Sequence, residues 1–114
     1  MRVKSKVWID SKGKLIFGTG KSEILKSIAR TGSLNKAAQE LNMSYRHAWS
    51  YIKSIEKRLG RPLLIRTKGG KYGGGAILTD YARDILAKFD ILDKDTKAFV
   101  DKRFNEIFSK PVEI

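Results

Sequence analysis

The sequence predicts a mainly α-helical domain with two small β-hairpins and a long C-terminal helix. Three observations support this prediction: two short amphipathic helical patterns around a tight turn, a glycine-rich segment flanked by short apolar runs, and a C-terminal stretch without proline or glycine. The chain has 114 residues, of which 41% are hydrophobic, enough for one modest core. We divide it into a domain over residues 1–78 and a long helix of the same structural unit over residues 79–109.

Residues 3–17 are expected to form the first hairpin. Over residues 3–9, valine and isoleucine alternate with lysine and tryptophan, the period of two that is typical of a strand. Residues 10–13 have turn composition, and residues 15–17 form the return strand. Because an isolated hairpin is marginally stable, its apolar side should pack on the helices or on a second copy of the chain.

Residues 21–30 are predicted to form the first helix, which Gly32 ends because glycine readily takes the left-handed conformation. The segment before it contains Gly-Lys-Ser, as phosphate-binding loops do, but position 15 holds leucine where that motif needs glycine. We therefore expect a helix terminus here and no nucleotide site. The side chains of this helix expected to be buried are Ile24, Leu25, Ile28 and Ala29.

Residues 33–60 carry the most informative pattern, a short helix, a tight turn and a basic amphipathic helix. Ser33 and Ser44 are expected to cap the two helices, and Gly60 to end the second. This is the plan of a helix-turn-helix. The predicted inward residues are Leu34, Ala37, Ala38 and Leu41 in the first helix, and Tyr45, Ala48, Ile52, Ile55 and Leu59 in the second; Arg46, Ser50, Lys53 and Lys57 face outward.

The first turn of the second helix, which spans about residues 44–59, would reach base edges in a major groove. Arg46 suits a two-pronged bond to guanine, whereas Tyr45 fits either a core position or a DNA contact, and Trp49 is expected in the core. His47 is the only histidine, and it suits a polar or phosphate contact better than catalysis or metal binding. The DNA-binding residues predicted in these helices are Ser33, Lys36, Ser44, Tyr45, Arg46, His47, Ser50 and Lys53.

Residues 63–78 predict a second hairpin, the wing of a winged helix-turn-helix. Two short apolar runs flank a glycine-rich tip, residues 68–75, whose backbone could lie along phosphates or enter a minor groove. The alternative is a disordered linker. The wing residues predicted to contact DNA are Thr67, Lys68, Lys71 and Tyr72.

Residues 79–109 predict a long helix capped by Thr79. At 1.5 Å per residue it would extend about 45 Å, more than so small a domain can cover. We expect its apolar stripe to pair with the same helix of a second chain; the alternative is that it folds back on its own core. The predicted dimerisation residues are Ile85, Phe89, Leu92, Phe99 and Phe104.

The charge of the chain predicts a polyanionic partner. The net charge is +12 and the isoelectric point is about 10.1. Residues 1–78 hold 17 Lys/Arg against 4 Asp/Glu, a net +13, whereas residues 79–114 hold 7 against 8, a net −1. Positive charge that served only solubility would not be confined to residues 1–78.

Several classes of protein are not supported by the sequence. There is no cysteine, hence no disulfide framework and no thiolate metal site. Neither a signal peptide nor an apolar run long enough for a membrane span is present, so we expect a cytoplasmic protein. No set of residues forms a catalytic or metal constellation, and we expect neither an enzyme nor a cofactor.

The chain resembles the LysR-type winged helix-turn-helix domain, and more closely the DNA-binding domain of ModE-type, molybdate-responsive transcriptional regulators. Residues 44–49 resemble the start of that family's recognition helix, residues 67–79 its glycine-rich wing, and the flanking hairpin and long helix its dimerising parts. The resemblance implies DNA binding and dimerisation. Full-length members continue into molybdate-binding domains, and this sequence stops at Ile114, so the resemblance does not imply molybdate sensing. Four alternatives stay open: there is no effector, the effector sits on a separate protein, it binds a site that the sequence does not identify, or the chain is a fragment.

The sequence therefore predicts a homodimer that binds double-stranded DNA sequence-specifically and regulates transcription. The recognition helix would lie in the major groove and the wing on the backbone or in the minor groove. Two alternatives stay open: an architectural DNA-binding protein without sequence preference, and a protein- or RNA-interaction module built on the long helix. The operator, the target genes and the direction of regulation do not follow from the sequence.

Overall fold

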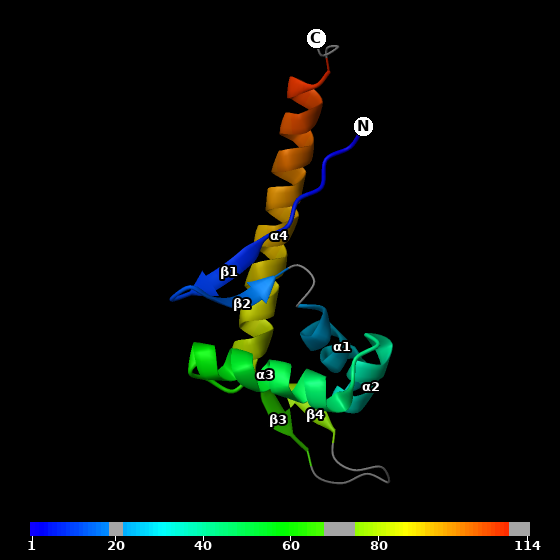
Figure 1. Cartoon of the computed structure of the whole chain (residues 1–114), viewed down its shortest axis with the longest axis vertical. Helices are drawn as coiled ribbons and strands as arrows, with labels where there is room; N and C mark the ends of the chain where they lie inside the picture. The colour runs from blue at the N-terminus through cyan, green and yellow to red at the C-terminus, as the bar shows by residue number, and fades with distance from the viewer. Residues whose placement is uncertain (19–21, 68–74, 110–114) are drawn as a thin grey trace.

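The computed structural model describes residues 1–18, 22–67 and 75–109. The elements follow the predicted order, and the mainly helical fold with two hairpins is confirmed (Figure 1). In chain order they are β1 (Trp8–Ser11), β2 (Lys14–Gly18), α1 (Glu23–Thr31), α2 (Leu34–Glu40), α3 (Tyr45–Leu59), β3 (Leu64–Arg66), β4 (Ala76–Leu78) and α4 (Asp80–Ile107).

The first hairpin is shorter at its start than the sequence predicts. β1 begins at Trp8, not at residue 3, and it includes Asp10 and Ser11, which the prediction assigned to the turn. The reason is the turn itself: Lys12 and Gly13 both have positive φ, 52° and 77°, so a two-residue turn brings Ser11 opposite Lys14. β2 then ends at Gly18, which lies opposite Trp8 at the start of β1. The predicted alternation of exposure over residues 3–9 is nevertheless present.

The core lies where α1, α2 and α3 meet. α1 begins at Glu23, and its predicted start at Lys21 lies outside the described residues. Ala29 and Leu41 were predicted to face inward, but both are exposed. Leu41 follows the last residue of α2, where the chain leaves the helix, and Ala29 lies beside the narrow stripe that α1 buries. The buried core residues of the three helices are Ile24, Leu25, Ile28, Leu34, Ala37, Ala38, Ala48, Ile52 and Ile55.

The helix ends follow the local signals in the sequence. The hydroxyls of Ser33, Ser44 and Thr79 each accept a hydrogen bond from a backbone N–H of the first helical turn, which satisfies one donor left free there. Gly32 and Gly60 end α1 and α3 in the left-handed conformation, with φ of 70° and 73°. The three predicted caps and both predicted glycine ends are confirmed.

The first hairpin packs on the first half of α4. The rings of Phe17 in β2 and Phe89 in α4 lie 5.4 Å apart at 41°, and Phe89 is only 2% exposed. Arg58 at the end of α3 donates a hydrogen bond to the carbonyl of Leu15, which ties the hairpin to α3 as well. The first half of α4 is therefore part of the domain core.

The second half of α4 extends away from the core. The described chain measures 63 × 29 × 22 Å, and Figure 1 shows the C-terminal half of α4 projecting beyond the other helices and strands. Over its 28 residues, α4 extends about 42 Å at 1.5 Å per residue. It does not fold back on its own core. Large apolar side chains are exposed from the middle of α4 onward: Ile91, Leu92, Phe99 and Ile107.

Candidate nucleic-acid interface

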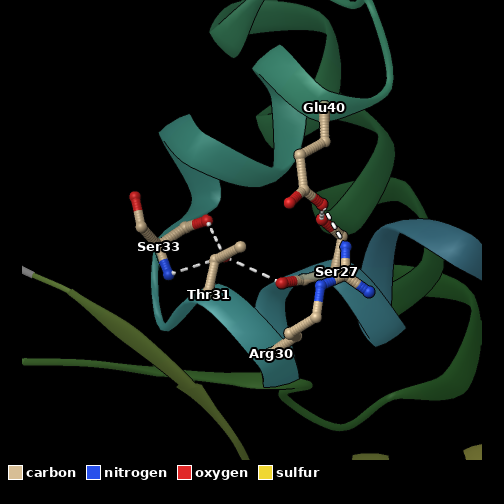
Figure 2. A network of polar contacts seen from close by, with 5 residues as sticks. All are labelled: Ser27, Arg30, Thr31, Ser33 and Glu40. Atoms are coloured by element: carbon tan, nitrogen blue, oxygen red, sulfur yellow. Dashed lines mark hydrogen bonds and ion pairs between the residues drawn. The ribbon is translucent and has the colours of Figure 1, made fainter.

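A network of polar contacts, centred on the buried Ser27, joins α2 to α1. Ser27, which is buried in α1, and Arg30 both donate hydrogen bonds to the carboxylate of Glu40 in α2 (Figure 2). The hydrogen bond from Ser27, followed by the effect of Arg30, lowers the pKa of Glu40. The hydroxyl of Thr31 also bonds to the carbonyl of Ser27, 2.8 Å away, and to the backbone of Ser33. The turn into the helix-turn-helix is thus held by side chains from both helices.

The exposed face of α3 carries most of the residues predicted to contact bases. Ser44, Arg46, His47 and Ser50 line one shallow depression of about 400 Å³, together with Tyr51 and Ser54. The opposite face of α3 buries Ala48, Ile52 and Ile55 in the core. One face therefore anchors the helix and the other presents a guanidinium, an imidazole and hydroxyls to the outside.

Lys53 lies apart from this depression. Its ammonium is 5.3 Å from the centre of the Trp49 ring and 3.2 Å from the carboxylate of Glu56. Trp49 was expected in the core, but it is 40% exposed, with one side available to Lys53. Lys53 also lines a crevice with Leu64 and Arg66 of β3, so it lies on the side of α3 that faces the wing.

Tyr45 lies on the surface, which corrects its assignment to the apolar stripe. It is 43% exposed, and its hydroxyl accepts a hydrogen bond of 3.0 Å from Arg66 in β3. Arg66 was not predicted to belong to the site. The alternation of the strand could have indicated it, because Arg66 shares a face with Leu64, and both line the crevice between β3 and α3.

Glu56 is a second residue that the prediction missed. Its largely buried carboxylate accepts hydrogen bonds from the backbone N–H groups of Leu63 and Leu64, at 2.6 and 3.4 Å. This contact attaches the start of β3 to the last turns of α3. In the sequence, the only indication of such a contact was an acidic residue among the basic residues of α3.

The wing forms the antiparallel hairpin that was predicted, with Ile65 opposite Ile77. Its base is fixed to the core by a 3.0 Å hydrogen bond from the N–H of Ala76 to the carbonyl of Gly32. Thr67 is exposed, and its N–H bonds to the carbonyl of Gly75 at 2.9 Å. A Cβ at position 75 would lie 2.8 Å from the Gly32 carbonyl oxygen, so glycine permits this close approach. Lys68, Lys71 and Tyr72, predicted at the tip, lie outside the described residues.

The other predicted site residues are distributed along α2 and α4. Lys36 is exposed on α2, where its N–H bonds to the hydroxyl of Ser33 at 3.1 Å. On α4, Leu92 and Phe99 are 47% and 64% exposed, whereas Ile85 and Phe104 are partly buried. Phe89 belongs to the core of its own chain, which removes it from the exposed face predicted for dimerisation.

No three His, Asp or Glu side chains come close enough together to hold a metal ion in the part of the chain that the structure describes. None of the described helices is both long and apolar enough to cross a membrane.

A three-helix core whose third helix presents a polar, basic face beside a two-stranded wing defines the winged helix-turn-helix class. The sequence profile of bacterial regulatory helix-turn-helix proteins of the lysR family matches residues 21–83. This chain therefore belongs to that family.

The relatives include proteins named for the same regulator that the sequence resembles. The transcriptional regulator ModE of Haemophilus influenzae is 44% identical over 71 residues, 62% of this chain and 28% of that protein. The DNA-binding transcriptional dual regulator ModE of Escherichia coli K12 is 36% identical over 87 residues, 75% of this chain and 33% of that protein. The chain thus spans about a third of the length of these relatives, and the predicted resemblance is confirmed.

Solved structures show the same fold. The full-length LTTR LysG from Corynebacterium glutamicum, with bound effector Arg, superposes with a TM-score of 0.56 at 25% identity, over 75% of this chain and 28% of that one. ArgP from Mycobacterium tuberculosis gives a TM-score of 0.50 at 20% identity, over 72% of this chain and 29% of that one.

Proposed function

We propose that this protein binds double-stranded DNA sequence-specifically as a homodimer and regulates transcription. The observation that carries the proposal is the exposed face of α3, where Arg46, His47 and Ser50 surround one depression while the opposite face is buried in the core. A helix presented in this way fits the major groove, and its first turns reach base edges. This role carries with it the cytoplasmic location expected from the sequence.

Within this proposal, Arg46 is the principal base-reading residue. Its guanidinium is exposed on the first turn of α3 and suits a bidentate contact to guanine. His47 and Ser50 lie in the same depression and supply further donors. The hydroxyl of Ser44 accepts a backbone hydrogen bond as a cap, and its own proton is still available to a phosphate.

The remaining contacts are assigned to the backbone. Lys36 and Ser33 at the start of α2, Lys53 on α3 and Thr67 on the wing are on the surface, where cations and hydroxyls bind phosphates without reading sequence. The same role is proposed for Lys68, Lys71 and Tyr72 of the wing tip, from the sequence alone.

The dimer is proposed to form through the part of α4 that runs from its middle to its C-terminal end. Leu92 and Phe99 are exposed on a helix that extends beyond the core, and exposed apolar side chains in a row indicate a protein partner. A second copy of the same helix is the simplest partner, with Ile85 and Phe104 at the edges of the contact. A two-fold dimer places its two recognition helices on half-sites about 34 Å apart, or a multiple of this distance.

The proposal covers DNA binding and not the sensing of an effector. The word molybdenum occurs in the names of several relatives, among them the molybdenum transport protein ModE of Azotobacter vinelandii, of which this chain covers 32%. An effector-sensing protein separate from this chain remains part of the proposal.

The proposal is tested by selection from a random duplex library with purified protein at about 0.15 M salt. At this salt concentration, interactions between exposed charges more than about 8 Å apart are largely screened. We expect enrichment of an inverted repeat whose spacing matches one or more turns of DNA. Retention of DNA without enrichment would favour the architectural alternative. The absence of any retained duplex would overturn the proposal and favour a protein or RNA partner.

A further inference from the structure

A second basic surface lies outside the residues assigned to DNA contact so far. It is a hollow of about 590 Å³ between the turn of the first hairpin and the C-terminal half of α3. In Figure 1 the β1–β2 turn and the end of α3 lie on the same side of the molecule. The residues that line the hollow are Ser11, Lys12, Lys14, Ser54, Lys57 and Arg58, four cations and two hydroxyls.

The three lysines of this hollow have no carboxylate partner in the part of the chain that the structure describes. Among the described residues, no carboxylate oxygen lies within 4.0 Å of the ammonium groups of Lys12, Lys14 or Lys57. Arg58 is held in place by its hydrogen bond to the carbonyl of Leu15. Like charges gathered in this way are stabilised by an anion, and a hollow lined by cations and hydroxyls fits phosphate oxygens.

The backbone at Lys12 is a second, independent observation. Its φ of 52° lies in the left-handed region, which costs an ordinary side chain free energy. In a two-residue hairpin turn of this kind, asparagine, aspartate or glycine is the residue without strain at the first position. Because strained residues are often retained at functional sites, a lysine in this conformation supports a functional role for its ammonium group.

The hollow is continuous with the base-reading surface. Ser54 lines both the hollow and the depression that contains Arg46, His47 and Ser50. α3 has 15 residues and is about 22 Å long at 1.5 Å per residue, whereas the major groove is about 12 Å wide. A helix whose first turns reach bases therefore brings its far end to the sugar-phosphate backbone.

We propose that the β1–β2 turn is a third DNA-binding element, in which Lys12 and Lys14, together with Lys57, bind backbone phosphates beside the bases that α3 reads. This proposal rests on the proposed function. It assigns to the hairpin a contact that strengthens binding to every sequence without choosing among bases.

The test uses a double variant that keeps the turn and removes its charges, Lys12→Asn with Lys14→Gln. Asparagine accepts the left-handed conformation, so thermal unfolding should show no loss of stability in this variant. The control is Lys94→Gln, which removes one charge from an exposed position on α4, far along the chain from the hollow. Wild type and both variants are titrated with the selected duplex and with a random duplex over a range of salt.

For the double variant we expect a shallower slope of log K against log salt than for wild type. The magnitude of the slope should decrease by about 0.9 per lost contact, hence by about 1.8 per protomer, equally on both duplexes. The Lys94→Gln slope should match wild type. If wild type binds the selected duplex and the double variant has the same slope and affinity, the hairpin contact is overturned while the proposed function stands. If wild type binds no duplex, both fail.

A free anion is the other source of the same chemistry, and a third measurement separates it. Inorganic phosphate is added to wild type and to the double variant during thermal unfolding. A phosphate-dependent rise in Tm that only wild type shows, combined with unchanged DNA slopes, would identify a small-anion site and overturn the proposal.

Discussion

Arg66 of the wing donates a hydrogen bond to the hydroxyl of Tyr45, 3.0 Å away on the first turn of the recognition helix. This contact joins the two elements proposed to hold DNA, across 21 residues of sequence. Because both side chains are exposed, the bond contributes little to folding and more to the relative position of the wing and α3.

The Arg66–Tyr45 contact predicts coupled losses of DNA affinity. Tyr45→Phe and Arg66→Gln should each weaken binding, and the double variant should lose less than the sum of the two. The expected coupling is about 0.5–1 kcal/mol, as for an exposed hydrogen bond. Fluorescence anisotropy with the selected duplex measures the cycle; additive losses would mean that the two residues act separately.

The hydrogen bonds that Glu56 accepts predict that two substitutions at this position lower the free energy of unfolding by different amounts. Glu56→Ala removes the acceptor for the buried N–H of Leu63 and should lower the free energy of unfolding by about 1–3 kcal/mol. Glu56→Gln keeps an acceptor oxygen and should lose much less. Urea unfolding monitored by circular dichroism gives both values, and equal losses would show that the N–H contact is not the cause.

Phe89 and Phe99 predict opposite effects of the same substitution on one helix. Phe89→Ala removes a core ring packed on Phe17 and should cost about 3–5 kcal/mol of unfolding free energy. Phe99→Ala should leave the unfolding of a dilute monomer nearly unchanged, because this ring is largely exposed. It should instead weaken self-association at least about tenfold, which is 1.4 kcal/mol.

Sedimentation equilibrium over a range of protein concentrations measures this self-association. A wild-type chain that stays monomeric throughout, or a Phe99→Ala variant that associates as strongly as wild type, would contradict the proposed role of α4.

Tyr51 predicts a loss of stability at high pH. Burial raises the pKa of Tyr51 from 10.0 to about 12, so folding favours the neutral phenol. A raised pKa contributes stability that is complete below pH 10 and is lost between pH 10 and about 12. Tyr51→Phe should flatten this part of the curve of unfolding free energy against pH. A variant with the same fall as wild type would assign the loss to other groups.

Local features of the fold could be predicted because neighbouring residues determine them. The caps at Ser33, Ser44 and Thr79 and the glycine ends of α1 and α3 each depend on a few adjacent residues, and all were predicted correctly. The buried stripes of the helices followed largely from helical periodicity for the same reason.

Features that depend on contacts between distant residues could not be predicted. Phe89 has the spacing of the apolar stripe of α4. Only the position of the first hairpin shows that Phe17 covers it. Tyr45 has the spacing of a core residue, yet its side chain is 43% exposed and its hydroxyl contacts Arg66 of β3. The partners of Arg66 and Glu56, namely Tyr45 and the start of β3, depend on how the wing packs against α3.

The central claim is that α3 reads bases through Arg46, and one comparison tests it most directly. Wild type and Arg46→Ala are titrated with the selected duplex and with a random duplex at one salt concentration. We predict a loss of about 1–3 kcal/mol on the selected duplex, a much smaller loss on the random one, and relaxed base preference at one position in each half-site. Equal losses on both duplexes would contradict a base-reading role for Arg46.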